Sequence, residues 1–430
     1  MTDLFAARSQ MAISLGFHII FAVIGMAMPF LMAISHWRWL KTKEPAYLDL
    51  TKAWSKGVAI FFATGAVSGT VLSFELGLLW PKFMEYAGPI SGLPFAWEGT
   101  AFFLEAIALG IFLYGWERVH PWAHWGSGVV VGVSGVASAL FVICANGWMN
   151  APAGFDWVNG EAINIDPVAA MFNRAALQLG LHMTIAAFCA TGFAVAGIHA
   201  IGLLRNPASA FHASAFHIAL FIGSVAAIVQ PLQGDRLAKQ TAVLQPAKLA
   251  AMEALFHTAR SAPLTLGGIP SEDTQTVRYG IQIPGLLSFL AHGDFDAEVA
   301  GLDQFPRENW PPVAVTHIAF QIMISIGVLL AAIGAWSLFA LWKNPTWLHS
   351  RKALWLFAFC TPLGFIAIEA GWTVTEVGRQ PWIIYGFMKT KDALSPMPGL
   401  IYPFIVITAV YLMLGFIVTW LLVRQFRHVG

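Results

Sequence analysis

The sequence predicts an all-α integral membrane protein with nine transmembrane helices, an N-terminus outside and a cytoplasmic C-terminus. Of its 430 residues, 57% are hydrophobic and 11% are charged, whereas soluble domains are about 45–50% apolar and about 25% charged. Nine apolar runs reach the roughly 20 residues that cross a bilayer. Basic residues are divided unevenly between the connecting loops, which predicts the orientation.

The nine apolar runs follow one another along the whole chain. We place them at 10–35, 54–80, 94–116, 125–149, 176–203, 213–231, 314–342, 354–377 and 400–424. The first run lacks a basic leading region and a small-residue cleavage site, so we expect a helix rather than a signal peptide.

The loops on one side of these runs carry twelve Lys and Arg residues, against six on the short segments of the other side. Basic loops face the cytoplasm, so the twelve belong inside. This orientation puts the long polar segment 232–312, and a shorter one at about 150–175, outside. A connection as long as 232–312 is typically functional.

Charge and cysteine content exclude several classes of protein. The net charge of +1 gives no signal for nucleic-acid binding. Cys144, Cys189 and Cys360 lie in apolar runs without a CxxC or CxxCH motif. Disulfide frameworks, zinc ribbons and c-type haem attachment are therefore not expected.

Ionisable residues inside the spans are the first candidates for function, because each is costly in hydrocarbon. They are His18, Glu75, Glu98, Glu105, His182, His199, His217, His317, Glu369 and Glu376. Glu98 and Glu105 are seven apart, as are Glu369 and Glu376, so each pair lines one face of a helix. Such a stripe suits a proton relay, ligation of a metal or haem, or a helix lining a polar cavity in a transporter.

Two histidines have neighbours that suit a flat macrocycle. Gly16 precedes His18 and Gly180 precedes His182, and a glycine lets a ring approach the backbone. A single intramembrane histidine is nevertheless more often a hydrogen-bonded helix contact. Met323 becomes a candidate only if a histidine of another helix faces it, because His/Met pairs hold low-spin haem.

Five motifs together resemble subunit I of the cytochrome bd-type quinol oxidases, over essentially the whole chain. They are the EAGW…E-x-GRQPW signature at 368–382, the paired-glutamate helix at 98–105, the QPxKxAAxE motif at 245–253, Gly234-Asp235, and Asn146-Gly147-Trp148-Met149.

The resemblance implies three haems and a role for each matching residue. His182 and Met323 resemble the axial pair of the low-spin haem b, and His18 and Glu376 the ligands of the two high-spin haems. Glu98 and Glu105 resemble the acids beside the oxygen-reducing site. Lys248 and Glu253 resemble the quinol-oxidising residues of the loop. Trp372 and Arg379 belong to the signature and resemble residues that line a haem pocket. Arg379 would neutralise a haem propionate or carboxylate.

The resemblance also divides the chain into three parts and implies partners. Residues 1–231 would carry a high-spin haem and the proton relay, 232–312 the outside quinol loop, and 313–430 further haem ligands. The cofactors would be two haems b and a haem d, or a third haem b, with ubiquinol or menaquinol as substrate. A homologous-fold subunit II, a small single-helix subunit, oxygen and membrane lipid would be partners in the bacterial inner membrane.

Two local departures refine this expectation. The stretch Ser73–Pro81 and the short loop resemble the cyanide-insensitive subgroup. Gln321 stands where some members have Arg, which removes a cation expected near the low-spin haem.

The predicted chemistry is quinol oxidation outside and reduction of oxygen to water with protons from inside. No HxxxY, paired histidines or CxxxC suggests a copper cluster, so a haem–copper oxidase is disfavoured. Two alternatives stay open on the residues alone. One is a proton-coupled secondary transporter that uses the intramembrane glutamates, and the other is a dihaem quinol dehydrogenase anchor.

Overall fold

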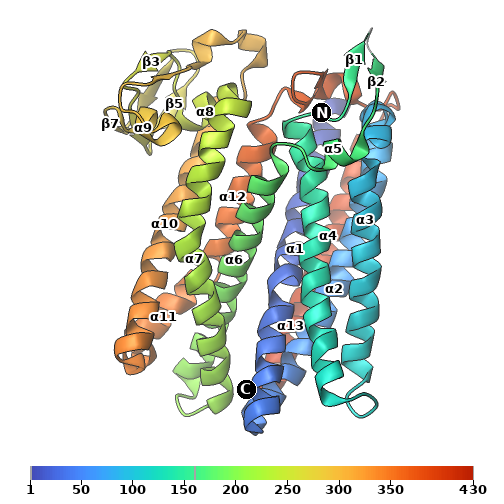
Figure 1. Cartoon of the computed structure of the whole chain (residues 1–430), viewed down its shortest axis with the longest axis vertical. Coiled ribbons are helices and arrows are strands. Elements are labelled where there is room, and N and C mark those ends of the chain that lie inside the picture. The colour runs from blue at the N-terminus through green and yellow to red at the C-terminus, as the bar shows by residue number, and fades with distance from the viewer. Residues whose placement is uncertain (1, 159–160, 430) are drawn as a thin grey trace.

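A bundle of long helices forms the body of the protein in a computed structural model that describes residues 2–158 and 161–429 (Figure 1). Nine helical segments within those ranges are long and apolar enough to span a membrane. They are α1 (Asp3–Thr42), α2 (Pro45–Leu79), α3 (Pro81–Tyr114), α4 (Pro121–Asn150), α6 (Ala176–Arg205), α7 (Ala210–Leu244), α10 (Val313–Lys343), the pair α11 (Arg351–Cys360) and α12 (Leu363–Val377), and α13 (Ile401–Val429). The predicted nine-span helical fold is confirmed.

Local sequence sets where several helices begin. Proline occupies the first turn of α2, α3 and α4, where its missing N–H costs no hydrogen bond. Ser209 caps α7 by accepting a hydrogen bond from the His212 amide, and Ser350 caps α11 in the same way. The helices therefore start at residues suited to satisfy their free amide groups.

Two boundaries differ from the sequence prediction. Helix α7 continues to Leu244 rather than ending at 231, so the long loop begins at Gln245. The eighth span is broken between α11 and α12 at Thr361-Pro362, since proline cannot continue the hydrogen-bond ladder of the preceding turn.

Small residues bring the central helices close together. A methyl group added at Gly192 of α6 would lie 2.5 Å from Gly223 Cα of α7, and one at Gly364 of α12 would lie 2.5 Å from Ala190 Cα of α6. Such contacts exclude any larger side chain, as is usual where membrane helices pack by backbone approach. Helix α6 consequently lies at the centre of the part of the bundle that contains α7, α11 and α12.

One end of the bundle, here called the loop face, carries most of the irregular structure and the start of α1 (Figure 1). Its short helices are α5 (Pro167–Met171), α8 (Pro246–Glu253) and α9 (Leu286–His292), with 3-10 turns at Leu302–Gln304, Arg307–Asn309 and Thr390–Ala393. A further 3-10 turn, Pro345–His349, precedes α11.

In the described parts of the chain, ten short strands form five antiparallel two-stranded ribbons, a detail that the all-α prediction lacked. The pairs are β1 (Asp156–Val158) with β2 (Glu161–Ile163), β3 (Ala259–Arg260) with β8 (Glu298–Val299), β4 (Leu264–Leu266) with β7 (Ile281–Ile283), β5 (Ile269–Ser271) with β6 (Thr276–Arg278), and β9 (Trp382–Ile384) with β10 (Met388–Lys389).

Candidate functional site

The predicted axial pair lies on two helices that share the same two neighbours. His182 is on α6 and Met323 is on α10, and both helices pack against α7 and α12. The two residues follow the loop-face starts of their helices by six and ten residues. They therefore lie at similar depth in one four-helix arrangement.

Both side chains are bordered by glycine. Gly234 of α7 lies beside His182, where an added methyl group would be 3.6 Å from Cε1. Gly371 of α12 lies beside Met323, where an added methyl group would be 3.0 Å from Sδ. The amide Nε2 of Gln230 is 3.2 Å from His182 Nε2.

His18 occupies a second region, between α1 and α2. Its Nδ1 is 2.9 Å from Ser68 Oγ, and a methyl group on Gly69 would lie 3.0 Å from its Cε1. Glu369 of α12 reaches the same part of α1, because a methyl group on Gly16 would be 3.3 Å from Glu369 Oε2. The sequence pointed to Gly16 as the glycine near His18, whereas the glycine that adjoins the imidazole is Gly69 of the facing helix.

Glu376 is held by two donors at the loop-face end of α12. Asn146 Nδ2 donates to its Oε1 at 2.7 Å, and Arg379 Nη2 donates to its Oε2 at 2.5 Å. Arg379 is 2% exposed, and burial lowers the pKa of its guanidinium while Glu376 raises it. Arg379 and Glu376, three residues apart in the chain, therefore form an ion pair.

Several buried donors near these residues have no partner among the described residues. They are Arg379 Nε and Nη1 and Trp372 Nε1. Buried polar groups in folded proteins are nearly always hydrogen-bonded, so these donors fit an anionic, planar group such as a haem with its propionates. Together with the glycines beside His18, His182 and Met323, they make the residues present suitable for haem.

A hydrogen-bonded chain links Lys248 of α8 to Glu376. Lys248 Nζ donates to Asn150 Oδ1 at 2.7 Å, and Asn150 Nδ2 donates to Asn146 Oδ1 at 3.1 Å. Asn146 then donates to Glu376, and Gln245 Nε2 donates to the Asn150 carbonyl oxygen at 2.9 Å. The chain joins the start of the long loop to the end of α12 through the last turn of α4.

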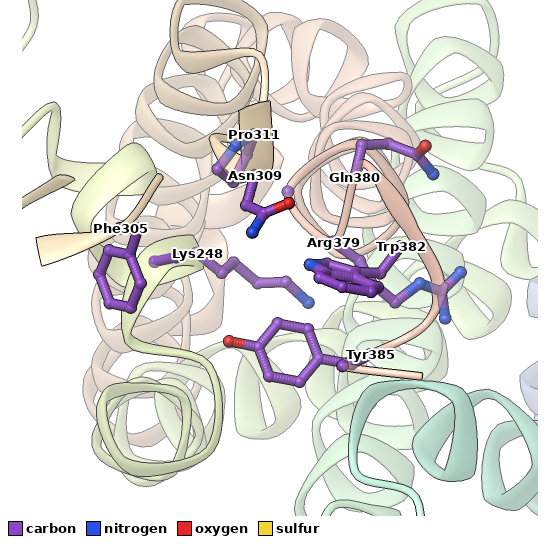
Figure 2. A pocket seen from close by; sticks show the side chains of 11 residues that line it. Lys248, Phe305, Asn309, Pro311, Arg379, Gln380, Trp382 and Tyr385 are labelled. Carbon is purple, nitrogen blue, oxygen red and sulfur yellow. The ribbon is translucent and has the colours of Figure 1, made fainter. Parts of the chain in front are cut away.

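Lys248 points into a cavity of about 170 Å³ between the loop and the turn after α12 (Figure 2). Phe305, Asn309, Trp382 and Tyr385 also line this cavity. Burial lowers the pKa of Lys248 to about 7, with a further lowering by Arg379 and an opposing effect of Glu376. The lysine thus changes charge near neutral pH in a site with three aromatic side chains and the Asn309 amide.

Glu253 ends helix α8 and does not line that cavity. It is 4% exposed, its Oε2 has no partner among the described residues, and burial raises its pKa to about 8. Lys248 and Glu253 are five residues apart, which is about 140° around a helix, and of the two only Lys248 lines the cavity.

Two residues of α10 anchor the long loop. His317 Nδ1 is 2.8 Å from the Met252 carbonyl oxygen, and its Nε2 is 3.0 Å from that of Gly267. Gln321 accepts from the Gly267 amide at 2.9 Å and donates to the Thr265 carbonyl oxygen at 2.9 Å. The Gln321 amide is therefore bound to the loop, a role that the sequence did not indicate.

The pair Glu98 and Glu105 of α3 faces α4. Ser138 Oγ donates to Glu98 Oε1 at a long 3.4 Å, and Glu105 lies beside Gly135, where an added methyl group would be 3.4 Å from Oε1. Glu105 is 7% exposed. The two carboxyl groups lie on one side of α3, as their spacing predicted.

The other intramembrane histidines pair with histidines at the face opposite the loop face. His199 Nδ1 is 2.9 Å from His212 Nδ1, and His217 Nε2 is 3.0 Å from His349 Nε2. Asn150 of the Lys248 chain was not singled out from the sequence, whereas Gln245 begins the QPxKxAAxE motif. The i, i+4 spacing of Asn146 and Asn150 at a helix end was the available signal.

Fold and site define a multi-pass membrane protein whose interior presents ligand-type His, Met and Glu side chains and unpartnered cationic donors. The family model for cytochrome bd terminal oxidase subunit I matches residues 6–429. The chain belongs to this family.

Relatives and a solved structure agree with that assignment. The putative cytochrome bd menaquinol oxidase subunit I of Bacillus subtilis is 36% identical over 99% of this chain and 97% of its own length. The cytochrome bd-II ubiquinol oxidase subunit 1 of Escherichia coli is 28% identical, over 91% and 89%. The bd oxidase from Geobacillus thermodenitrificans matches with a TM-score of 0.94 at 36% identity over 99% of both chains.

The predicted family, the quinol oxidase class and the location in a bacterial inner membrane are confirmed. The secondary transporter and the dihaem dehydrogenase anchor are set aside, because neither belongs to this family.

Proposed function

We propose that this chain oxidises quinol at the loop face and reduces oxygen to water inside the bundle with three haems. His182 and Met323 would hold a low-spin haem b, and His18 and Glu376 would each hold one high-spin haem. The three haems would be two of b type and one of d type, or all of b type. When bound, these groups supply electron transfer and an open coordination position for oxygen. The observation that carries the proposal is the placement of His182 and Met323, each beside a glycine, on helices that share α7 and α12.

The chain's own residues would divide the remaining tasks. Lys248 would hydrogen-bond a quinol oxygen from the cavity wall, and Glu253 would accept a quinol proton as a general base. Arg379 and Trp372 would bind propionate with donors that have no other partner in the described structure. Met252, which Glu253 follows, is held by His317, so α10 would position the base.

Protons for water would come from the opposite face through Glu105 and Glu98. A buried carboxyl group with few fixed partners can gain and lose a proton without breaking a hydrogen-bond network. No hydrogen bond to the Glu105 side chain is formed within the described residues and Gly135 lies beside it, while Glu98 has one long hydrogen bond. The opposite face would then be cytoplasmic, as its excess of basic residues predicts.

Assembly would follow the family. The chain would pair with subunit II, with a small single-helix subunit and lipid as additional partners. Relatives are named for menaquinol and for ubiquinol, and either headgroup could accept a hydrogen bond from Lys248.

The test is to purify the complex and record a pyridine haemochrome, a reduced-minus-oxidised spectrum and quinol-driven oxygen uptake. We expect about three haems per complex, a low-spin b signal and oxygen uptake. A complex without haem, or with haem but no quinol-driven oxygen uptake, would contradict the proposal.

A further inference from the structure

Four polar side chains meet in the membrane-spanning part of the bundle at the interface of α1, α2 and α13. They are Gln10 and Ser14 of α1, Glu75 of α2 and Tyr411 of α13, and each is at most 3% exposed. No role was assigned to them above. A carboxyl group inside a membrane helix is costly and marks a candidate functional site.

Some polar atoms of this cluster are hydrogen-bonded and others have no partner among the described residues. Gln10 Nε2 and Ser14 Oγ both donate to Glu75 Oε1, each at 2.9 Å. Glu75 Oε2, Gln10 Oε1 and the Tyr411 hydroxyl are buried, and no hydrogen bond to them is formed within the described residues. The Tyr411 hydroxyl nevertheless lies near Ser14 and Glu75.

Each of these three atoms has a hydrogen-bonding capacity that water can satisfy. Water can donate to Glu75 Oε2 and to Gln10 Oε1, and it can accept from the Tyr411 hydroxyl. Buried waters typically make about three such bonds to groups that otherwise lack a partner. The cluster therefore has the composition of a buried water-binding site that includes one acid, Glu75.

The charge of Glu75 is not balanced by a cation. No salt bridge to Glu75 is formed in residues 2–158 and 161–425, and the titratable group facing it is the phenol of Tyr411. Its other neighbours, Gln10 and Ser14, are neutral. An unpaired buried carboxylate is unfavourable, so a small change in nearby charge shifts its protonation.

The cluster is aligned with His18. Ser14 precedes His18 by one turn on the same face of α1, and Ser68, which contacts His18, precedes Glu75 by two turns on α2. The contacts Gln10–Glu75, Ser14–Glu75 and His18–Ser68 thus form a ladder between the two helices. These contacts follow one another along the two helices from the loop-face end of the bundle to His18, the candidate haem ligand.

We propose that Gln10, Ser14, Glu75 and Tyr411 form a water and proton site, in which Glu75 gains a proton when the centre at His18 gains an electron. The inference rests on the proposed function in one respect, namely that His18 holds a haem. The electron comes from quinol, and the proton comes from water at the loop face and converts the carboxylate to a carboxylic acid. Both leave when the centre is reoxidised, so nothing is consumed over a cycle.

The physical reason is linkage between two charges in a medium of low dielectric constant. An added electron raises the proton affinity of a nearby carboxylate, and protonation reciprocally favours the electron. Glu98 and Glu105, on α3, would supply the protons for water, whereas Glu75 would only compensate charge.

Redox-induced infrared difference spectroscopy of the purified complex tests this directly. We expect a carboxylic C=O band in the reduced state that shifts in ²H₂O and disappears in Glu75→Gln. Tyr411→Phe, which removes only the hydroxyl, should shift the band without abolishing it. The control Glu85→Gln changes an exposed carboxyl group of the neighbouring helix α3 and should leave the band unchanged.

The outcomes separate this inference from the proposed function. A band that persists in Glu75→Gln, or that is insensitive to Tyr411→Phe, overturns the inference, provided that the haem spectrum of the variant is intact. Should Glu75→Gln fail to assemble, the Tyr411→Phe shift alone decides. A wild-type complex without haem would instead overturn the assignment of His18.

Discussion

The glutamate pairs of α12 and α3 share a seven-residue spacing but lie in different surroundings. In α12, Glu376 is fixed by Asn146 at 2.7 Å and by Arg379, which is 2% exposed. In α3, Glu98 has one hydrogen bond of 3.4 Å, and Glu105 faces a glycine. A carboxylate held by two donors suits a fixed ligand, whereas one with few partners suits a proton carrier. Spacing alone locates both pairs, but only tertiary partners distinguish Glu376 from Glu98 and Glu105, and also from Glu369 of its own helix, whose Oε1 has no partner among the described residues.

The largest expected effect comes from breaking the ion pair between Glu376 and Arg379. Glu376→Ala removes the candidate ligand and leaves Arg379 buried without its partner, which costs about 3–5 kcal/mol for a buried ion pair. We expect loss of one high-spin haem and a lower Tm, measured by haemochrome content and thermal unfolding.

The matched control is Glu308→Ala. Glu308 pairs with Lys389 at 3.0 Å but is 74% exposed, and exposed pairs contribute little. Haem content and Tm should stay unchanged there. Full haem content and an unaltered Tm in Glu376→Ala would contradict the view that Glu376 of α12 is a fixed ligand, unlike the glutamates of α3.

The second effect concerns the loosely held pair. Glu105→Gln cannot carry a proton, so we expect oxygen reduction to slow by about 10²-fold or more, the usual contribution of a positioned acid or base. Reduction of the low-spin haem by quinol should be nearly normal, as followed by stopped-flow spectroscopy. Wild-type turnover would instead favour a structural role for this stripe.

A pH profile tests the base at the loop. Burial raises the pKa of Glu253 to about 8, so its basic, deprotonated form increases as pH rises through that value. We expect kcat/KM for quinol to increase between about pH 7 and 9. This increase with pH should be absent in Glu253→Gln. An artificial electron donor that bypasses the loop should still support oxygen uptake. If both activities fall together, Glu253 maintains the fold and is not the base.

The smallest effect is expected at the loop anchor. Gln321→Leu removes two hydrogen bonds to Thr265 and Gly267, each worth about 0.5–1.5 kcal/mol. We expect the KM for quinol to rise about threefold to tenfold, with kcat and the low-spin haem spectrum little changed. Ser337→Ala, a buried hydroxyl on the same helix that donates to Ile333, is the control. A shifted haem potential with unchanged KM would instead assign Gln321 to the haem.

Much of this arrangement could be predicted from the sequence because hydrophobic length fixes membrane helices and helical periodicity fixes faces. The nine spans and the shared faces of the glutamate pairs follow from those two rules. The extension of α7 to Leu244 was missed because polar residues after 231 end the apolar run without ending the helix.

The partners of the site residues could not be predicted in the same way. Gln321 contacts a loop some 55 residues away, and Asn150 contacts Lys248 across 98 residues. Such contacts depend on how the loop folds back on the bundle. Conversely, Gly16 was noted beside His18 and Gly371 lies in the 368–382 signature, yet only the structure shows that they adjoin Glu369 and Met323.

The central claim is that His182 and Met323 hold one low-spin haem between α6 and α10. The reduced-minus-oxidised spectrum of the purified Met323→Leu complex tests it most directly, because leucine keeps the volume but removes the sulfur ligand. We predict that the low-spin b signal is lost or converted to high spin, while the other haem signals are retained. An unchanged low-spin spectrum in this variant would contradict the assignment.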